Sequence, residues 1–193
     1  MQGATMEIDI EAEVPKLKKR GRLHAFRRIS VLGRLTYDAL RFEGDRSIKS
    51  EVITRYLSAE AQAFNSRDGS LALSPANYKF HYKGLLERDG KQVHLFQVSP
   101  RKKKVGMFNG ELWLDPETHL ALRESGRFVK SPSVFLKSVE FVRQFEIRDG
   151  MSIPTSIQTS VDTRLVGKAN LTVAYTAVSF PGDASITQAG ESQ

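Results

Sequence analysis

The sequence predicts a mainly β protein with one or two helices, in which a strongly curved antiparallel sheet carries a helix over its concave face. Two observations lead to this prediction. Apolar and polar residues alternate with a period of two over most of the 193-residue chain, and short turn signals separate the alternating runs. One segment, residues 53–64, has the period of an amphipathic helix instead. So many sequential strands must curl or split into two sheets, and one helix is enough to cover one face of a curled sheet.

The first strand is predicted over residues 6–14, where alternate apolar side chains share one face and four carboxylates share the other. Pro15 and a basic stretch end it. Further extended segments are expected at 21–32 and 34–42, and the turn residues Glu43–Asp45 close the second of them. Three consecutive strands with short connections favour a meander.

The period changes after this meander. Residues at i, i+3, i+4, i+8 and i+11 are apolar, which indicates one helical face made by Ile53, Tyr56, Leu57, Ala61 and Phe64. Ser47 or Ser50 is expected to cap the start of this helix, and Asn65 with Gly69 supplies a stop.

The chain then returns to strands, which makes nine or ten in all. They are expected at about 78–87, 91–99, 106–114, 119–129, 135–147, 151–164 and 168–180. The pairs Asp89-Gly90 and Asp149-Gly150 suit tight turns, and Pro116 suits the second position of a turn. Residues 1–181 are expected to form a single β domain, and residues 182–193, which are poor in apolar side chains, a disordered tail.

The composition limits the chemistry and leaves the location open. The chain has no cysteine, which excludes thiolate catalysis, disulfides and zinc sites that need a thiolate. Its apolar runs are far shorter than the roughly 20 residues that span a bilayer, and its N-terminus has no apolar signal-peptide core. Either the protein is cytoplasmic or a leader has been removed, so export stays open.

The chain carries a formal net charge of +7, which favours acidic partners such as phospholipid headgroups, nucleic acid or an acidic protein surface. Basic residues gather between Lys16 and Arg55, including Arg27 and Arg28, and again in a cluster formed by Arg101, Lys102, Lys103 and Lys104. Both groups are interpreted as loops or exposed strand faces. Solubility and the protection of sheet edges by lysine are the alternative to a binding surface.

No catalytic or metal-binding pattern is present, so we expect no catalytic residue, no metal, no cofactor and no enzymatic activity. The four histidines lack any short ligand spacing, and Ser125 is not part of a nucleophile elbow. Glu111 and Asp115 flank Trp113, but one is expected to face solvent and the other to begin a turn. The basic cluster contains no aromatic residue, so no nucleic-acid partner is expected.

Apolar residues at strand and helix spacing supply either a core or a ligand cavity. If the sheet is open, part of this set could line a pocket for an acyl chain, which gains roughly 0.8 kcal/mol per buried methylene. The candidate lining residues are Leu35, Tyr37, Leu40, Ile53, Tyr56, Leu57, Phe96, Val98, Phe108, Leu112, Leu114, Leu171, Val173 and Tyr175.

The stretch Gly110–Thr118 resembles a turn motif of the outer-membrane lipoprotein-sorting family, the LolA-like and RseB-like periplasmic proteins. A hairpin and a strand ending in Pro100 precede the motif, which consists of Trp113, Asp115 and Thr118. An arginine-containing strand over Leu122–Glu124 and the later pair Ile153-Pro154 follow in the order of the family. The resemblance implies a half-open, unclosed β-barrel that holds lipid or lipoprotein acyl chains in the periplasm without chemical turnover. It also implies a removed signal peptide.

The hypothesis from the sequence is therefore a periplasmic or cell-envelope carrier that binds a lipid or lipidated protein, with basic loops that meet an anionic membrane surface or a partner. The alternative is a non-enzymatic envelope sensor or protein-interaction module of the same fold, whose core is filled by side chains. A hydrolase would require polar titratable groups that converge inside the cavity.

Overall fold

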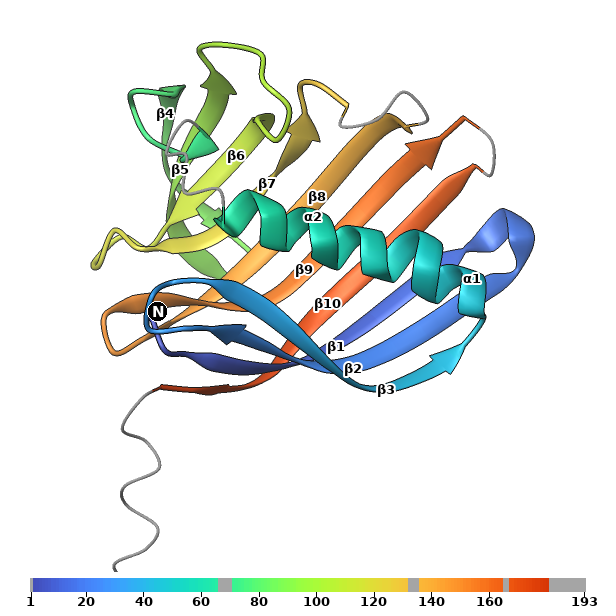
Figure 1. Ribbon diagram of the computed structural model, residues 1–193. Helices are drawn as coiled ribbons and strands as arrows, with labels where there is room; N and C mark the ends of the chain where they lie inside the picture. The colour runs from blue at the N-terminus through green and yellow to red at the C-terminus, as the bar shows by residue number, and fades with distance from the viewer. Residues whose placement is uncertain (1, 66–70, 132–135, 165–166, 181–193) are drawn as a thin grey trace, which may run out of the picture.

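The computed structural model describes residues 2–65, 71–131, 136–164 and 167–180, and these form one antiparallel sheet with one helix (Figure 1). The first three strands are β1 (Thr5–Val14), β2 (Lys19–Ile29) and β3 (Leu35–Gly44). The other seven are β4 (Tyr78–Arg88), β5 (Lys91–Pro100), β6 (Phe108–Leu114), β7 (Ala121–Phe128), β8 (Leu136–Arg148), β9 (Met151–Thr163) and β10 (Lys168–Ser179).

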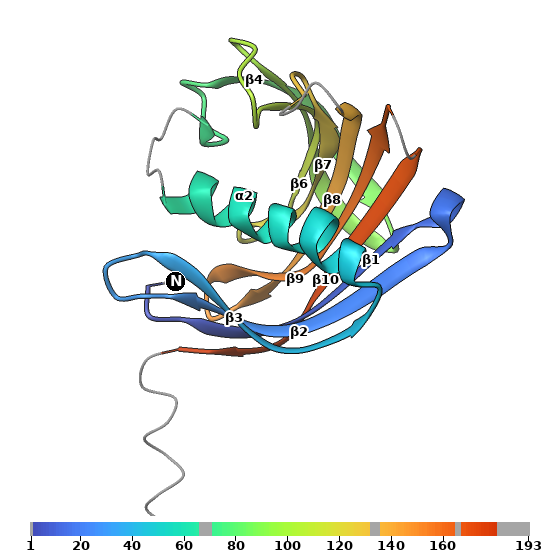
Figure 2. The same cartoon turned by 45° about the vertical axis from the view of Figure 1, so that its right-hand side comes forward.

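The sheet order is β3-β2-β1-β10-β9-β8-β7-β6-β5-β4, so almost every strand lies beside its neighbour in the chain. The exception is the pairing of β1 with β10, which sets Ile10 opposite Val173. The edge strands β3 and β4 do not pair with each other, and the barrel is not closed. The structure thus confirms the predicted fold class, a curved antiparallel sheet with a helix over its concave face (Figure 2).

The helix is longer than predicted and begins at Arg46, ahead of both Ser47 and Ser50, which were expected to cap it. It consists of α1 (Arg46–Ile48), a π-helical turn η2 (Lys49–Ile53) and α2 (Thr54–Asn65) without a break. Ile48 and Ile53 are both buried, yet they lie five positions apart, so a search for a period of 3.6 does not connect them. The start is capped by Asp45, which accepts a hydrogen bond of 2.8 Å from the Ser47 backbone.

The helix ends at Asn65, as predicted, and this residue also ties the helix to the sheet. Its side-chain oxygen accepts a hydrogen bond from the Leu35 backbone nitrogen at 2.7 Å, and its amide donates to the Leu35 carbonyl at 3.0 Å. The end of α2 is therefore fixed to the start of the edge strand β3. No helix in the described ranges is long and apolar enough to cross a membrane.

Some strand ends differ from the prediction because turns extend further into the apolar runs. β2 ends at Ile29, since Ser30 accepts the backbone hydrogen bonds of Gly33 and Arg34 in a short loop. β7 begins two residues later than expected, because His119 lies in the turn with a φ of 57°. A short 3-10 turn, η1 (Pro15–Leu17), joins β1 to β2.

The concave face carries two separate apolar clusters. The first, called the helix cluster, packs α1, η2 and α2 through Ile48, Ile53 and Leu57 against β1, β2, β9 and β10. The second, called the aromatic wing, is made by strands β4 to β8 and contains no residue of the helix. Its members are Tyr78, Phe80, Phe96, Val98, Met107, Phe108, Leu112, Leu114, Ala121, Phe128, Val129 and Phe141, together with Leu71 and Leu73.

Candidate functional site

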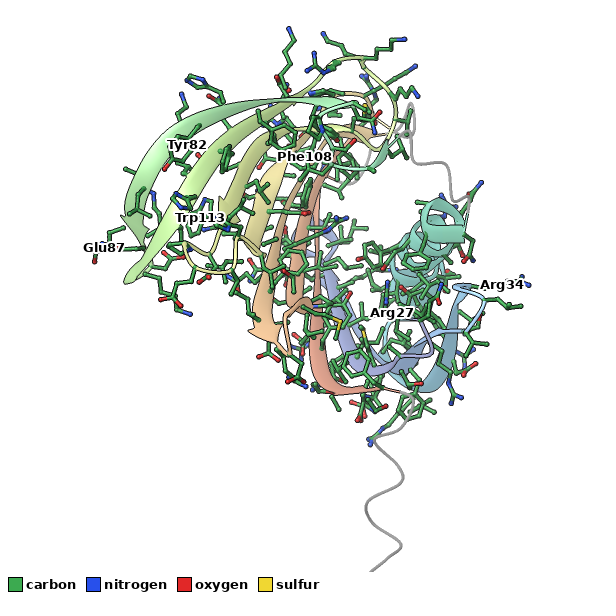
Figure 3. All side chains as sticks on the ribbon, turned by 90° about the vertical axis from the view of Figure 1, so that its left-hand side faces the viewer. Arg27, Arg34, Tyr82, Glu87, Phe108 and Trp113 are labelled. Carbon is green, nitrogen blue, oxygen red and sulfur yellow. The ribbon has the colours of Figure 1, made fainter. Side chains whose placement is uncertain are left out.

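The aromatic wing forms because the strand register places phenylalanines on one face of the sheet, with glycines between them. Val98 lies opposite Gly110, Gly110 opposite Gly126, and Gly126 opposite Phe141. The Phe108 ring packs edge-on against Phe141, with ring centres 4.9 Å apart. The result is an apolar cluster rich in phenylalanine, and Phe108 lies on the side of the sheet that faces the helix (Figure 3).

The wing is filled around Tyr78, whereas other side chains of the same cluster are partly exposed. Tyr78, Val98 and Met107 are fully buried. In contrast, Phe80, Phe96, Leu114 and Phe128 are only partly buried, and none of them packs against the helix cluster. Tyr82 and Leu85 extend the exposed apolar surface along the edge strand β4. The wing therefore offers apolar side chains that no part of the helix covers.

A buried ion pair lies beneath the helix, on the other half of the concave face. Arg27 is only 6% exposed, and its guanidinium donates to Glu60 of α2 at 3.2 and 3.3 Å. The same group contacts the Met6 sulfur at 3.7 Å and lies 5.5 Å from the centre of the Phe64 ring. Burial is the largest single effect and opposes the charged form of Arg27, but Glu60, Tyr175 and Tyr37 together outweigh it and raise the pKa of the guanidinium. Arg27 is thus a charged anchor for the helix, not the exposed residue that we expected.

Three tyrosines surround this ion pair and keep their protons. Burial, and then the negative charge of Glu60, raise the pKa of Tyr37 and of Tyr56 and raise that of Tyr175 to about 12. The Tyr37 hydroxyl is buried beside Glu60 without a hydrogen bond of normal geometry. These hydroxyls can donate hydrogen bonds at neutral pH, but none of them can act as an anionic nucleophile there.

A second ion pair lies between the tyrosines and the aromatic wing. Arg143 of β8 approaches Glu124 of β7 at 3.4 Å, and its guanidinium lies 5.1 Å from the centre of the Phe141 ring. The positive charge of Arg143 acts to lower the pKa values of Tyr56 and Tyr175, against the larger effects of burial and of Glu60. The concave face is therefore apolar over the wing and polar where the wing approaches the helix.

The residues predicted from the sequence fall into both parts of the concave face. The wing contains Phe96, Val98, Phe108, Leu112 and Leu114. The helix cluster contains Tyr37, Ile53, Tyr56, Leu57, Leu171, Val173 and Tyr175, and Leu35 is buried at the start of β3. Leu40 belongs to neither cluster. It is 53% exposed because a bulge in the pairing of β2 with β3 leaves it without a partner, so we exclude it from the candidate surface.

The prediction missed Phe80, Phe128, Phe141 and the ion pair of Arg143 with Glu124. The alternation of β8 contains the missing signal, since Val139, Phe141 and Arg143 have the same parity. A lone arginine in such a run is easily assigned to the solvent face, and only the pairing with β7 shows that Glu124 lies beside it.

The turn motif Trp113-Asp115-Thr118 is built around one carboxylate. Asp115 accepts hydrogen bonds from the Glu117 backbone at 3.1 Å and from the Thr118 backbone and hydroxyl at 2.8 Å. These bonds, those of Thr118 first, lower the pKa of Asp115 below its ordinary value. Trp113 is buried on the opposite face from the wing, where the Arg123 guanidinium lies 4.4 Å from the centre of its ring.

Replacement of Asp115 by alanine is expected to remove a small, pH-dependent part of the stability. Because the pKa of Asp115 is lowered in the folded state, its contribution is present above the ordinary carboxyl pKa and disappears as the pH falls through the folded value. Asp115 is partly exposed and its hydrogen bonds lie in a surface turn, so the loss at pH 7 is expected to be about 1 kcal/mol or less. Urea unfolding of both proteins at pH 7 and pH 2.5 measures it. Equal losses at the two pH values would contradict this account.

The convex face offers a shallow groove of a different character. It has a volume of about 570 Å³ and runs across β7 to β10. Eight of the twelve residues that line it are polar or charged, including Ser125, Gln158, Ser160, Asn170 and Thr172. Within the described ranges, no three histidine, aspartate or glutamate side chains are grouped closely enough to hold a metal ion. The basic residues Arg101 to Lys104 are exposed in the loop between β5 and β6.

Comparison with solved structures finds proteins with a similar fold, although no known family model and no curated protein matches the sequence. A DUF1329 family protein from Desulfovibrio piger has a TM-score of 0.48 and 14% identity. A putative outer membrane lipoprotein-sorting protein domain from Vibrio parahaemolyticus has a TM-score of 0.46 and 10% sequence identity. A LolA superfamily protein from Nitrosomonas europaea has a TM-score of 0.41 and 11% sequence identity. Each alignment covers 93% of this chain and 86% of the other.

Proposed function

We propose that the protein is a non-enzymatic carrier that binds the acyl chain of a lipid or lipidated protein on the aromatic wing. The observation that carries this proposal is the set of partly exposed apolar side chains on the concave face, which the helix leaves uncovered. Acyl chains gain roughly 0.8 kcal/mol for each methylene removed from water, so a surface of this kind favours them. A periplasmic or cell-envelope location, which the sequence resemblance implies, belongs to the same proposal.

The polar groups beside the wing suit the other end of an amphiphilic ligand. Arg143 and Glu124 present one positive and one negative group at the boundary of the wing. The tyrosine hydroxyls nearby remain protonated and add hydrogen-bond donors. A ligand with its chain on the phenylalanines would place its polar end against these groups.

Protein purified from membranes and analysed by native mass spectrometry, with extraction of its lipids, tests the proposal directly. Bound acyl-containing molecules are the expected result. Repeated absence of lipid, together with no binding of a fluorescent fatty acid, would overturn the proposal.

A substitution in the wing is expected to weaken this binding without unfolding the sheet. Phe96→Ala removes a partly exposed ring that packs against Phe80 and Tyr82, so the apolar contact with the ligand decreases. Loss of about half of the transfer energy of a phenylalanine side chain corresponds to roughly tenfold weaker binding of a fluorescent fatty acid. Val31→Ser is the control, because Val31 is highly exposed in the hairpin after β2, away from the wing. An equal effect of both changes would contradict a site on the wing.

The filled part of the wing around Tyr78 favours the alternative function, a sensor or protein-interaction module without bound lipid. Tyr78, Val98 and Met107 are fully buried, so this part of the concave face is already a core. The two functions differ in the same experiment. A protein that never carries lipid, yet loses binding to a protein partner in Phe96→Ala, supports the alternative.

A further inference from the structure

The two ends of the sheet differ sharply in charge. Because neighbouring strands are antiparallel, the connections that follow β1, β3, β5, β7 and β9 gather at one end of the sheet, along the upper and right-hand rim in Figure 1. With the helix left aside, the described residues of these connections include eight basic and one acidic: Lys16, Lys18, Arg101, Lys102, Lys103, Lys104, Lys130, Arg164 and Asp45. The helix belongs to the connection after β3 and adds three basic and two acidic residues: Arg46, Lys49, Arg55, Glu51 and Glu60. We call this the basic end.

The opposite end has the reverse balance. The described connections that follow β2, β4, β6 and β8 contain one basic and four acidic residues: Arg34, Asp89, Asp115, Glu117 and Asp149. Three of these acidic residues serve the turns themselves. Asp89 and Asp149 each adopt a φ of 51°, and Asp115 accepts the hydrogen bonds of its own turn. The excess positive charge of the chain is therefore concentrated at the basic end.

Most of the charges at the basic end have no counter-charge within the described part of the chain. Lys16, Lys18, Lys130 and the three lysines 102–104 have no carboxylate within ion-pair distance there, and Asp45 is already engaged by Lys19 at 3.3 Å. Unpaired like charges repel one another and oppose folding. The unpaired lysines at the basic end therefore create a positive electrostatic potential, which an anionic partner would neutralise.

Exposed apolar side chains stand among these lysines. Leu17 is 46% exposed between Lys16 and Lys18, and Val105 is 44% exposed directly after Lys104. Apolar side chains flanked by lysine are favoured at the boundary between lipid headgroups and acyl chains, where each group meets its preferred surroundings.

We infer that the basic end docks on the surface of an anionic phospholipid bilayer. The lysines would contact the headgroups, and Leu17 and Val105 would enter the interface. Outside the helix, the described connections at this end contain no aromatic side chain for base stacking, and lysines outnumber arginines there, so nucleic acid fits less well. The charges are also spread over several connections along the curved rim, and a broad bilayer surface can meet them together. This inference does not depend on what the aromatic wing binds.

Sedimentation of the full chain with lipid vesicles tests the inference. The expected result is binding to vesicles of one part phosphatidylglycerol and two parts phosphatidylcholine, little binding to phosphatidylcholine alone, and loss of binding as salt is raised. The triple variant K102S/K103S/K104S is expected to bind the anionic vesicles about 100-fold more weakly, since each lysine near such a surface contributes about fivefold. These three side chains make no described contacts, so the fold is expected to persist.

The matched control removes three basic residues near the opposite end, in the variant R34S/R88S/K91S. It has the same net charge as the first variant, and its binding is expected to stay close to that of the unaltered chain. Equal weakening in both variants would overturn docking through the basic end, because net charge alone would then explain it. Binding to a DNA duplex that is tighter than binding to the vesicles at the same salt would also overturn it.

Discussion

Replacement of Arg27 by alanine is expected to lower the free energy of unfolding by about 3 to 5 kcal/mol. The change leaves Glu60 without its partner beneath the helix, where only 23% of its side chain is exposed. It also removes the contacts of the guanidinium with Met6 and Phe64. Because small domains are stable by about 5 to 15 kcal/mol, a loss of this size is a large fraction of the total. Urea unfolding followed by circular dichroism measures it.

The neighbouring residue provides the control. Arg28 pairs with Asp38 at 2.9 Å, but both side chains are more than half exposed, so Arg28→Ala is expected to cost about 1 kcal/mol or less. The double variant R27M/E60L removes both charges and is expected to recover most of the stability that R27A loses. If R27A proves as mild as R28A, or if R27M/E60L unfolds as readily as R27A, the ion pair does not anchor the helix.

The second large effect is expected for Gly110→Ala, with a loss of about 3 kcal/mol from overpacking. A Cβ atom at Gly110 would stand 1.9 Å from the Ser125 carbonyl oxygen and 2.6 Å from the Gly126 Cα. Both are backbone atoms, so β6 and β7 would have to separate. Gly126 is crowded as well, since a Cβ atom there would stand 2.6 Å from the Phe108 ring. Thermal unfolding and the near-ultraviolet spectrum of the aromatic wing both report this change.

Gly90→Ala separates crowding from backbone conformation. Gly90 has a φ of 72° and nothing within 4 Å of a Cβ, so its replacement introduces strain at a positive φ but no clash. A loss of about 1 kcal/mol is expected there. Equal losses at Gly90 and Gly110 would show that the close approach of β6 and β7 is not what requires glycine.

The strands were largely predictable because each one follows local rules. The run from Met6 to Val14 alternates without interruption, and the structure has β1 at Thr5–Val14 with the same residues buried. The turns at Asp89 and Asp149 also lie where their Asp-Gly pairs indicated. In contrast, the helix start was missed because Asp45 caps it and a π-helical turn follows. The extra residue in the π-helical turn shifts the helical periodicity, so a search for a period of 3.6 residues does not detect the first part of the helix.

The candidate site was only partly predictable from the sequence, because its charged residues lie within strands whose alternate residues are otherwise apolar. Leu23, Ala25, Arg27 and Ile29 have the same parity along β2, so alternation places Arg27 on the buried face. The many other basic residues nearby hid this signal. Glu60 of the helix pairs with Arg27 of β2, and Glu124 of β7 pairs with Arg143 of β8. Both pairs depend on tertiary packing, which the sequence alone does not show. Likewise, the bulge that exposes Leu40 has no mark in the sequence.

The pairing of β1 with β10 has a consequence for how the chain folds. All the other strand pairs join neighbours in the chain, so each can form soon after its second strand is available. The β1 and β10 strands, in contrast, meet across nearly the whole chain, with Asn170 donating to Glu13 from 157 positions away.

Until that contact forms, β1 is the open edge of a three-stranded unit, and its partner is the last of the ten described strands in chain order. Closing so long a loop costs conformational entropy before the contacts between β1 and β10 stabilise the chain. The joining of β1 to β10 is therefore the slow step expected in refolding, and exposure of the β1 edge in the meantime sets the window in which the chain is open to aggregation.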